Sequence, residues 1–467
     1  MTIPAKIVAV GGSSGFSGLL VRQEDLANET MRFCSYNCEK LALAMSLIDL
    51  SVCMASSVHA QAGDQDLSRA AEKGLWDQQY LFGDWGGTRS RLAKRGVKFE
   101  VFNIDDLQVD VTGSQAHHGA YFGRFYGSTD VDFNQLADFD GEFFSSAFWQ
   151  FGQNLSGRYL HVNTLTSSIA GMETHRLDEF WYRQGFLNHL FTIQVGQIAT
   201  VDEFGATDFS DILFNDELGY APNALFQAKQ PYSPAAKPGV VGWSDLSGLT
   251  RGLYAKAGIF AAYDNPFHPD KYGVDVNDDF DHGMVVSFEL GYREPGTKYP
   301  GSFKIGINAN DTSVYLDPST EQRLRGNFTA YGLIEKAIYH PTDTFGRPFE
   351  KNGLDVLCEF LGAPGDRNNL EFEFTAGARY TGLIPGRDQD KTGLGIIYSK
   401  NGGAFSDAYA ATHGHGLGGE TTLEADYQIN PLGWFSLQFD CQYIIDPGGD
   451  SQRTGIAVLG LRTIFRF

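Results

Sequence analysis

The chain has 467 residues, which is enough for about three ordinary domains or for one large barrel. Its 55 glycines, 36 Phe and 21 Tyr beside only 16 prolines exclude a disordered chain and a helical bundle. The net charge of -21 argues against a nucleic-acid-binding surface, and no run of about 20 apolar residues could form a membrane-spanning helix.

The first recognisable pattern is the apolar stretch from Leu41 to Met54. It follows the basic residues Arg32 and Lys40 and leads to small residues before Gln61, an order typical of a secretory signal peptide. We therefore expect a leader over residues 1–60, with Met31 as an alternative start. A buried N-terminal helix is the other interpretation of this stretch.

The residues that could bind a metal or form a disulfide are few and scattered. Without the leader only Cys358 and Cys441 remain, too far apart in sequence for a metal knuckle, and they form no disulfide scaffold. The histidines at positions 117, 118, 413 and 415 lie in glycine-rich loops without acidic or thiol partners at ligand spacing. We expect no metal site and no cofactor, and we interpret the acidic loop at 275–281 as solvated, with weak Ca²⁺ binding left open.

Beyond an expected periplasmic segment at residues 61–96, the rest of the chain, 97–467, repeats one pattern. Segments of about ten residues alternate apolar with polar or small side chains, as Leu370–Thr381 and Phe435–Tyr443 do, and this is typical of a transmembrane β-barrel. A soluble β-sandwich would share the alternation, but its strands often have about five or six residues. Many segments here are longer, as tilted membrane strands require.

About sixteen strands are expected, an even number as in bacterial barrels. They lie near residues 97–111, 121–133, 142–152, 176–187, 190–199, 237–244, 250–262, 283–293, 302–314, 326–339, 353–362, 369–382, 390–401, 416–429, 433–444 and 454–467. With a periplasmic C-terminus, the tight connections 187–190 and 430–433 are periplasmic. The long connections outside are 153–175, 200–236, 263–282 and 402–415. The predicted fold is all-β, a transmembrane antiparallel barrel with long extracellular loops folding into the lumen.

The side chains assigned to the lumen predict the kind of solute that passes. Acidic and basic residues are nearly balanced there, unlike the basic ring of a phosphate pore. Interleaved aromatic, amide and charged side chains suit a neutral polyhydroxyl solute, so a sugar is expected. The residues predicted near the sugar path are Glu179, Trp181, Arg183, Glu203, Arg379 and Arg462. An interfacial aromatic belt with a structural arginine is the alternative for Trp181 and Arg183.

The connection 200–236 is the longest of the outer loops. Such length without strand patterning usually marks a functional loop or disorder. Its phenylalanines Phe204, Phe209 and Phe214 need a surface to pack on, which makes disorder the poorer choice. We therefore predict that this loop folds into the lumen and, with 153–175, sets the pore width.

The stretch from Leu81 to Arg89 resembles the entry motif of the carbohydrate-selective outer-membrane porins of the OprB type. Its motif residues are Gly83, Asp84, Trp85, Gly86, Gly87 and Arg89. The resemblance continues through Phe180–Gln184, Val195–Ile198 and Asp202–Phe204, ends at Phe467 and covers about residues 75–467. Arg183 stands where the family usually carries an acidic residue.

The resemblance implies a sixteen-stranded barrel in the bacterial outer membrane that passes monosaccharides and related polyols. It favours a monomer over a trimer, with outer-membrane lipids and lipopolysaccharide as its surroundings and no nucleic acid. We expect no enzymatic activity, because the outward faces offer no Ser/His pair. The alternatives are a channel for other solutes or general diffusion, and a receptor or adhesin with a plugged lumen.

Overall fold

The computed structural model describes residues 74–113, 117–207, 209–218, 227–263, 271–274, 283–296, 299–341 and 352–467. The expected leader, residues 1–60, and the acidic loop at 275–281 lie outside these ranges. Residues 72–467 form one unit.

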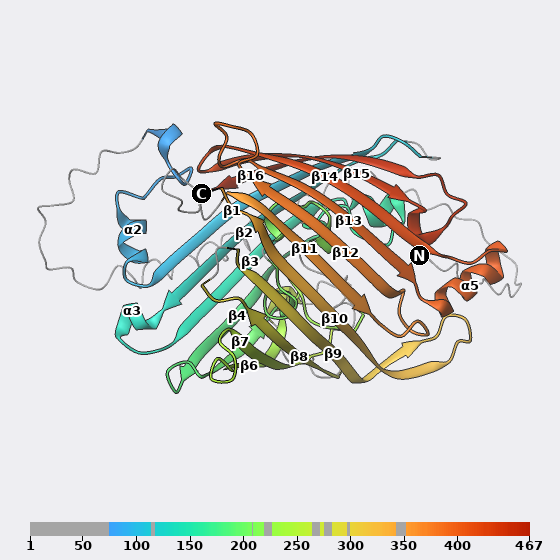
Figure 1. Ribbon diagram of the computed structural model, residues 1–467, viewed down its shortest axis with the longest axis horizontal. Coiled ribbons are helices and arrows are strands. Elements are labelled where there is room, and N and C mark those ends of the chain that lie inside the picture. The colour runs from blue at the N-terminus through green and yellow to red at the C-terminus, as the bar shows by residue number, and fades with distance from the viewer. Residues whose placement is uncertain are drawn as a thin grey trace, which may run out of the picture. The chain divides into compact units, whose positions relative to one another are not determined.

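The segments with alternating apolar and polar side chains form strands. Sixteen strands of the described chain close into one antiparallel barrel (Figure 1). Each strand pairs with the strands before and after it in the sequence, and β1 pairs with β16. The strands are β1 Val97–Asp110, β2 Gly119–Asp132, β3 Glu142–Gly152, β4 Thr174–Phe186, β5 Phe191–Ile198, β6 Lys237–Asp245, β7 Leu253–Ala261, β8 Met284–Arg293, β9 Gly301–Leu316, β10 Arg323–Tyr339, β11 Gly353–Gly362, β12 Leu370–Thr381, β13 Lys391–Asn401, β14 Gly419–Leu432, β15 Phe435–Ile445 and β16 Ile456–Arg466. All of the predicted strands are present, each with its bounds within three residues of those expected.

Within the described ranges, helical structure lies in the segment before β1 and in the connections between strands. The α-helices are α2 Thr88–Ala93, α3 Phe133–Ala137 and α5 Gly403–His413. The short helical turns are η1 Leu75–Asp77, η2 Ser156–Leu160, η3 Thr200–Asp202, η4 Phe209–Asp211, η5 Asp216–Leu218, η6 Lys271–Gly273 and η7 Pro447–Gly449. Within the described ranges, no helix is both long and apolar enough to cross a membrane.

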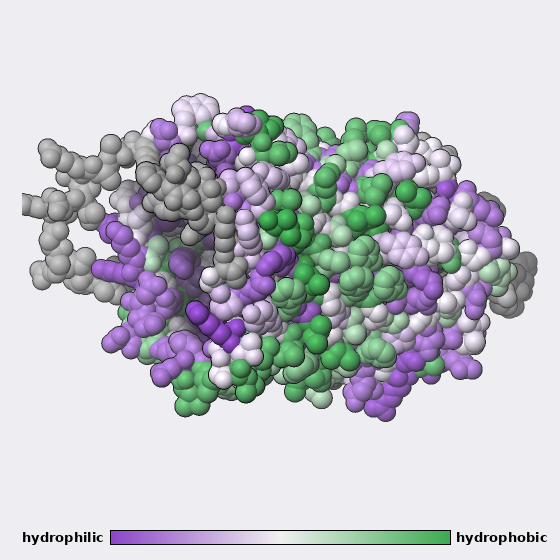
Figure 2. All heavy atoms as spheres, in the orientation of Figure 1, coloured by the Kyte–Doolittle hydropathy of each residue, from purple (hydrophilic) through white to green (hydrophobic). Residues whose placement is uncertain are grey.

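The two faces of the barrel wall differ in the way the alternation predicts. In β8, Met284, Val286 and Phe288 are exposed by 46–50%, whereas Ser287 and Glu289 point inward and are at most 1% exposed. Figure 2 shows the apolar side chains gathered in a belt between two more polar ends. Such a belt is the surface that a membrane barrel presents to lipid.

One strand departs from the expected faces. Strict alternation over Leu370–Thr381 would place Leu370 on the same outer face as Phe372, but a bulge shifts the pairing with β13 between these two residues. Leu370 is therefore 3% exposed, while Phe372 remains on the outer face. A bulge inserts one extra residue into a strand, so the side chains before it point to the opposite face of the sheet from the one that strict alternation predicts.

Candidate functional site

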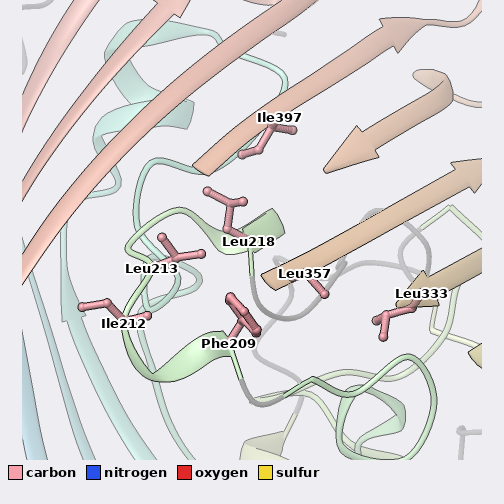
Figure 3. Packing of buried hydrophobic residues seen from close by; sticks show 7 residues of the cluster. All are labelled: Phe209, Ile212, Leu213, Leu218, Leu333, Leu357 and Ile397. Carbon is pink, nitrogen blue, oxygen red and sulfur yellow. The ribbon is translucent and has the colours of Figure 1, made fainter. Parts of the chain in front are cut away.

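The connection between β5 and β6 runs through the inside of the barrel. Its apolar side chains pack against inward residues of three distant strands, as Figure 3 shows. The cluster consists of Phe209, Ile212, Leu213 and Leu218 from the loop and Leu333, Leu357 and Ile397 from β10, β11 and β13. Each is at most 2% exposed, and burying a side chain of this size contributes about 1.5–3 kcal/mol. We call residues 199–218 the lumen loop.

Glycines in the barrel wall make room for this loop. Gly393 and Gly395 of β13 face inward opposite Leu213 and Leu218. A Cβ atom on Gly395 would lie 2.4 Å from Leu218 Cδ1, and one on Gly393 would lie 2.9 Å from Leu213 Cδ2. Because glycine has no Cβ atom, β13 can lie closer to the lumen loop at these two positions than it could with any other residue there.

The connection between β3 and β4, residues 153–173, also enters the lumen. The carbonyl oxygen of Thr166 accepts hydrogen bonds from Gln108 Nε2 at 2.7 Å and from Gln442 Nε2 at 2.8 Å. This connection meets the lumen loop directly, because Ser168 N donates to the Phe214 carbonyl oxygen at 2.7 Å. The prediction that these two long loops fold inward is confirmed.

An open space remains beside the lumen loop. It is a cavity of about 500 Å³, lined among others by Arg183, Glu203, Trp243, Tyr254, Lys256 and Arg293. This volume lies within the range of small-molecule sites, about 300–1,000 Å³. The turns 187–190 and 246–252 also contribute lining residues, which places the cavity near the end of the barrel at which these two turns lie.

Arg183 is the centre of a charged network in this cavity. Its Nη1 donates to Glu142 Oε2 and its Nη2 to Glu203 Oε1, both at 3.0 Å. Gln194 Oε1 accepts from Nε at 3.1 Å and from Nη2 at 2.7 Å. Lys256 Nζ lies 3.6 Å from Glu203 Oε2 and donates to the Glu203 carbonyl oxygen at 2.6 Å. Two cations thus face two carboxylates, so the network carries no net charge.

Aromatic rings enclose this network. The guanidinium carbon of Arg183 lies 4.5 Å from the ring centre of Trp181 and 4.8 Å from that of Trp243. Burial inside the barrel raises the pKa of Glu203, and the neighbouring Lys256 and Arg183 oppose that rise. The wall of the cavity therefore combines flat apolar surfaces with fixed hydrogen-bond donors and acceptors.

The structure brings Arg183 and Glu203 together but distributes the other predicted path residues around them. Trp181 is 7% exposed, packs with Phe204 and donates from Nε1 to Glu179 Oε1 at 3.2 Å, so Trp181 and Glu179 lie in the wall behind the cavity.

Arg379 and Arg462 lie on the opposite side, against the lumen loop. Arg379 pairs with Asp211 at 2.8 Å and Asp355 at 3.0 Å. Arg462 is 4% exposed, pairs with Asp106 at 2.7 Å and lies 4.0 Å from the Phe214 ring centre. In this arrangement both arginines hold the loop and do not line the cavity.

Trp243 and Tyr254 were not named in the sequence prediction. The alternation of β6 indicated that Trp243 points inward, because it lies two residues from the buried Val241 and therefore on the same face of the strand. Tyr254 lies near the start of β7, where its hydroxyl donates to Glu289 Oε1 at 3.0 Å. Its place in the cavity depends on the pairing of β7 with β8, which the sequence does not specify.

The glycine-rich motif lies elsewhere, at the join between the first and last strands. Gly83, Gly86 and Gly87 have φ values of 63°, 63° and 86°, a left-handed backbone that favours glycine. The turn they form positions Arg89, whose Nη2 donates to the Phe467 carbonyl oxygen at 2.7 Å.

Other residues in and beside the motif also contact Arg89 or Phe467, and we call this set of contacts the C-terminal clasp. The Arg89 guanidinium lies 3.6 Å from the Tyr80 ring centre and 4.6 Å from that of Trp85. Asp84 Oδ1 accepts from Ser90 N at 2.8 Å, and the Phe82 ring lies 5.4 Å from the Phe467 ring. The motif therefore holds the C-terminal residue beside the β1–β16 seam.

Replacing Arg89 by Met should lower barrel stability without changing conductance. The substitution removes a partly buried, charge-assisted hydrogen bond worth about 1.5–3 kcal/mol, far from the cavity. The measurement is the temperature at which the folded form is lost on a semi-native gel. Arg91→Met is the matched control, because Arg91 is exposed and its side chain donates to Thr88 within its own helix. Equal unfolding temperatures for the two variants would show that the C-terminal clasp does not stabilise the barrel.

A closed barrel with an outer apolar belt and a polar lumen narrowed by inward loops is the architecture of an outer-membrane diffusion channel, a porin. Residues 116–467 match the model of a family described as "Carbohydrate-selective porin, OprB family". The chain belongs to this family of carbohydrate-selective porins of the bacterial outer membrane.

Two relatives and one solved structure are similar to this chain. The chain is 20% identical over 434 residues to Porin B of Pseudomonas aeruginosa, covering 85% of this chain and 94% of that protein. It is 22% identical over 352 residues to a putative porin, QuiX, of Acinetobacter baylyi, covering 68% and 74%. The high-pH structure of Pseudomonas putida OprB shares the fold, with a TM-score of 0.76 at 16% identity over 85% of this chain and 100% of that one.

Proposed function

We propose that this porin passes monosaccharides and related polyols by passive diffusion, through the cavity beside the lumen loop. The observation that carries this proposal is the neutral network of Arg183, Glu142, Glu203 and Lys256 set against the ring of Trp243. Sugar hydroxyls can exchange water for the charged donors and acceptors, while the apolar ring face of the sugar stacks on the indole. A network without net charge gives an ion no advantage over a neutral solute.

The predicted path residues have different parts in this proposal. Arg183 and Glu203 contact the sugar. Glu179 and Trp181 support them from the wall, while Arg379 and Arg462 keep the lumen loop in position. Transport needs no bond to form or break, so we propose that the channel has no enzymatic activity and needs no cofactor.

We also propose a monomer surrounded by outer-membrane lipid and lipopolysaccharide. Each of the sixteen strands carries at least one large apolar side chain that is exposed, from Leu107 in β1 to Leu459 in β16. None of the described strands therefore has a wholly polar outer face that would mark it as the contact surface for a second subunit.

Processing is a separate proposal. Residues 1–60 would be removed on export and leave 61–96 as the periplasmic segment. A mature N-terminus near Gln61 would support it, and an intact Met1 in outer-membrane material would refute it.

Liposome swelling tests the transport proposal. Proteoliposomes should swell rapidly in glucose and other six-carbon sugars or polyols and much more slowly in disaccharides, because the lumen loop narrows the path. Equal rates for both classes would instead indicate a general diffusion channel. Vesicles that do not swell in any sugar would indicate a plugged receptor.

A further inference from the structure

Three inward carboxyl groups lie close together on β14 and β15. Asp426 and Asp440 are directly opposite each other where these strands pair, and Glu424 is two residues from Asp426 on the same face. One oxygen atom from each of the three lies within 4.8 Å of the other two. Each residue is only 4% exposed, and like charges placed opposite each other destabilise a sheet. This group, which we call the carboxylate cluster, therefore needs a compensating positive charge.

Two cations lie on the flanking strands, each two positions along the sheet from the cluster, and both already have acidic partners. On β16, Arg462 donates to the two carboxylate oxygens of Asp106, at 2.7 and 2.8 Å. On β13, Lys391 is paired with Asp211 of the lumen loop. One carboxylate already balances each of these cations, so the cluster keeps its negative charge.

Directly opposite the cluster, the flanking strands carry glycine. On β13, Gly393 pairs with Asp426. On β16, Gly460 pairs with Asp440, and a Cβ atom on that glycine would lie 2.6 Å from Asp440 Oδ2. The Asp440 carboxylate therefore lies over a position without a side chain, and neither glycine can offer it a side-chain donor.

The oxygen atoms of the cluster have unused capacity to accept. Asp426 Oδ1 accepts from Gln438 Nε2 at 2.7 Å, but among the residues that the structure describes no donor reaches its buried Oδ2. The two oxygens of Asp440 share one amide donor, Gln442 Nε2, at 3.2 and 3.3 Å. Thr422, the next inward residue of β14, is 1% exposed, and its hydroxyl oxygen also lacks a partner in the described ranges. Buried acceptors without a donor cost free energy unless a cation or a proton satisfies them.

The spacing of the three carboxylate oxygens suits one Ca²⁺ ion. Ca²⁺ binds oxygen ligands at about 2.3–2.6 Å, so two oxygens on the same ion are at most about 5 Å apart. The 4.8 Å limit within the cluster meets this condition without any movement of the strands. Mg²⁺ prefers shorter distances and gives up its water reluctantly, which is a disadvantage among side chains that are 4% exposed.

We propose that Glu424, Asp426 and Asp440 bind one Ca²⁺ ion inside the barrel. Its charge balances carboxylates that would otherwise repel each other in a buried place, so the ion stabilises the pairing of β14 with β15. The ion is structural, and the proposed passage of sugar does not depend on it chemically.

The proposed ion lies beside contacts to the lumen loop. Asn215 N donates to Glu424 Oε2 at 3.1 Å, and Gln438 Nε2 donates both to Asp426 and to the Ile212 carbonyl oxygen. The ion would therefore order the part of the wall on which the loop tip rests. Elsewhere the loop is held by Arg379, Lys391 and Arg462.

The expectation of no metal site came from the spacing of cysteine and histidine residues. The carboxylate cluster escapes that reasoning, because Asp440 joins Glu424 and Asp426 only when β14 pairs with β15.

The test is Ca²⁺ binding to the detergent-purified barrel, measured by equilibrium dialysis with radioactive Ca²⁺ in a constant background of Mg²⁺. Wild type should bind one ion per chain that Asp426→Asn does not, with half-saturation below about 1 mM Ca²⁺. Asp426→Asn and Asp440→Asn each keep the shape of the side chain and remove one charge. Each should weaken the affinity at least about tenfold, because the affinity of a Ca²⁺ site depends on the number of charged ligands.

Glu420→Gln is the matched control. Glu420 is also a buried, inward carboxyl group of β14, but it accepts from the backbone N–H groups of Asn163 and Gly448. Its variant should bind Ca²⁺ as wild type does.

Thermal unfolding on a semi-native gel gives a second measurement. Ca²⁺ should raise the unfolding temperature of wild type and Glu420→Gln by several degrees relative to EDTA, because an ion that binds only the folded state stabilises it. Asp426→Asn and Asp440→Asn should show no such rise. In EDTA both should be at least as stable as wild type, because one of the repelling charges is gone.

Equal Ca²⁺ binding by wild type and the two Asn variants would overturn the site. An unfolding temperature of wild type that Ca²⁺ does not change would overturn it too, and is the result expected if a shared proton relieves the repulsion instead. Binding of Mg²⁺ as tight as that of Ca²⁺ would overturn the choice of ion. None of these results bears on the transport proposal, which sugar swelling of proteoliposomes tests separately.

Discussion

Deleting residues 206–230 should raise single-channel conductance severalfold and remove most of the discrimination between mono- and disaccharides. This segment contains Phe209, Ile212, Leu213 and Leu218, which fill the lumen against β10, β11 and β13. Without it the sixteen strands would enclose a wide, water-filled channel. The measurements are planar-bilayer conductance and the ratio of swelling rates in glucose and sucrose. Unchanged conductance and an unchanged ratio would show that the loop does not bound the path.

A point substitution tests the same contact without shortening the chain. Gly395→Ala would place a Cβ 2.4 Å from Leu218 Cδ1 and should displace the lumen loop, which changes conductance in the direction of the deletion or of a blocked pore. Gly332→Ala is the matched control, because a Cβ at that strand glycine meets nothing within 4 Å. If both variants conduct as wild type does, the packing against β13 does not control the pore.

Replacing Arg183 by Met should turn a weakly selective pore into a cation-selective one. The substitution removes the cation that pairs with Glu142 and leaves Glu203 paired with Lys256. One uncompensated charge beside the path is worth about 1 kcal/mol to a passing ion, or roughly a fivefold change in the ratio of cation to anion permeability. The measurement is the reversal potential in a KCl gradient.

The effect should depend on pH with a definite sign. Burial already raises the pKa of Glu203, and loss of Arg183 removes one of the two cations that oppose the rise. A carboxyl group is charged only above its pKa, so cation selectivity should weaken as the solution is acidified, and the loss should begin at a higher pH than an exposed glutamate would give. Lys400→Met is the control, because Lys400 is exposed and pairs with Glu371, outside the cavity. Arg183→Met with the selectivity of wild type at pH 8 would contradict the charged network.

The fold was largely predictable from sequence because each membrane strand has lipid on one face and the lumen on the other. That arrangement imposes a strict alternation, which gave all sixteen strand positions. The exception, Leu370, lies at a bulge, and a bulge depends on pairing with the neighbouring strand and leaves no mark in the alternation.

The site was less predictable, because an inward side chain can face either open lumen or the underside of a loop. Arg183 and Arg462 both point inward, yet the first lines the cavity and the second is covered by Phe214. The alternation of β14 places Glu424 inward, but its contact with Phe214 and Asn215 depends on the path of the lumen loop. That path depends on packing between residues about two hundred positions apart, which no local pattern reports.

The most direct test of the account is the effect of glucose on the current through single wild-type channels. If sugars bind beside Arg183 and Trp243, glucose should reduce the KCl conductance along a saturating curve, and Arg183→Met should weaken the apparent affinity. A conductance that falls only in proportion to solution viscosity, equally for glucose and for a large trisaccharide, would show that the cavity does not bind sugar and would contradict the account.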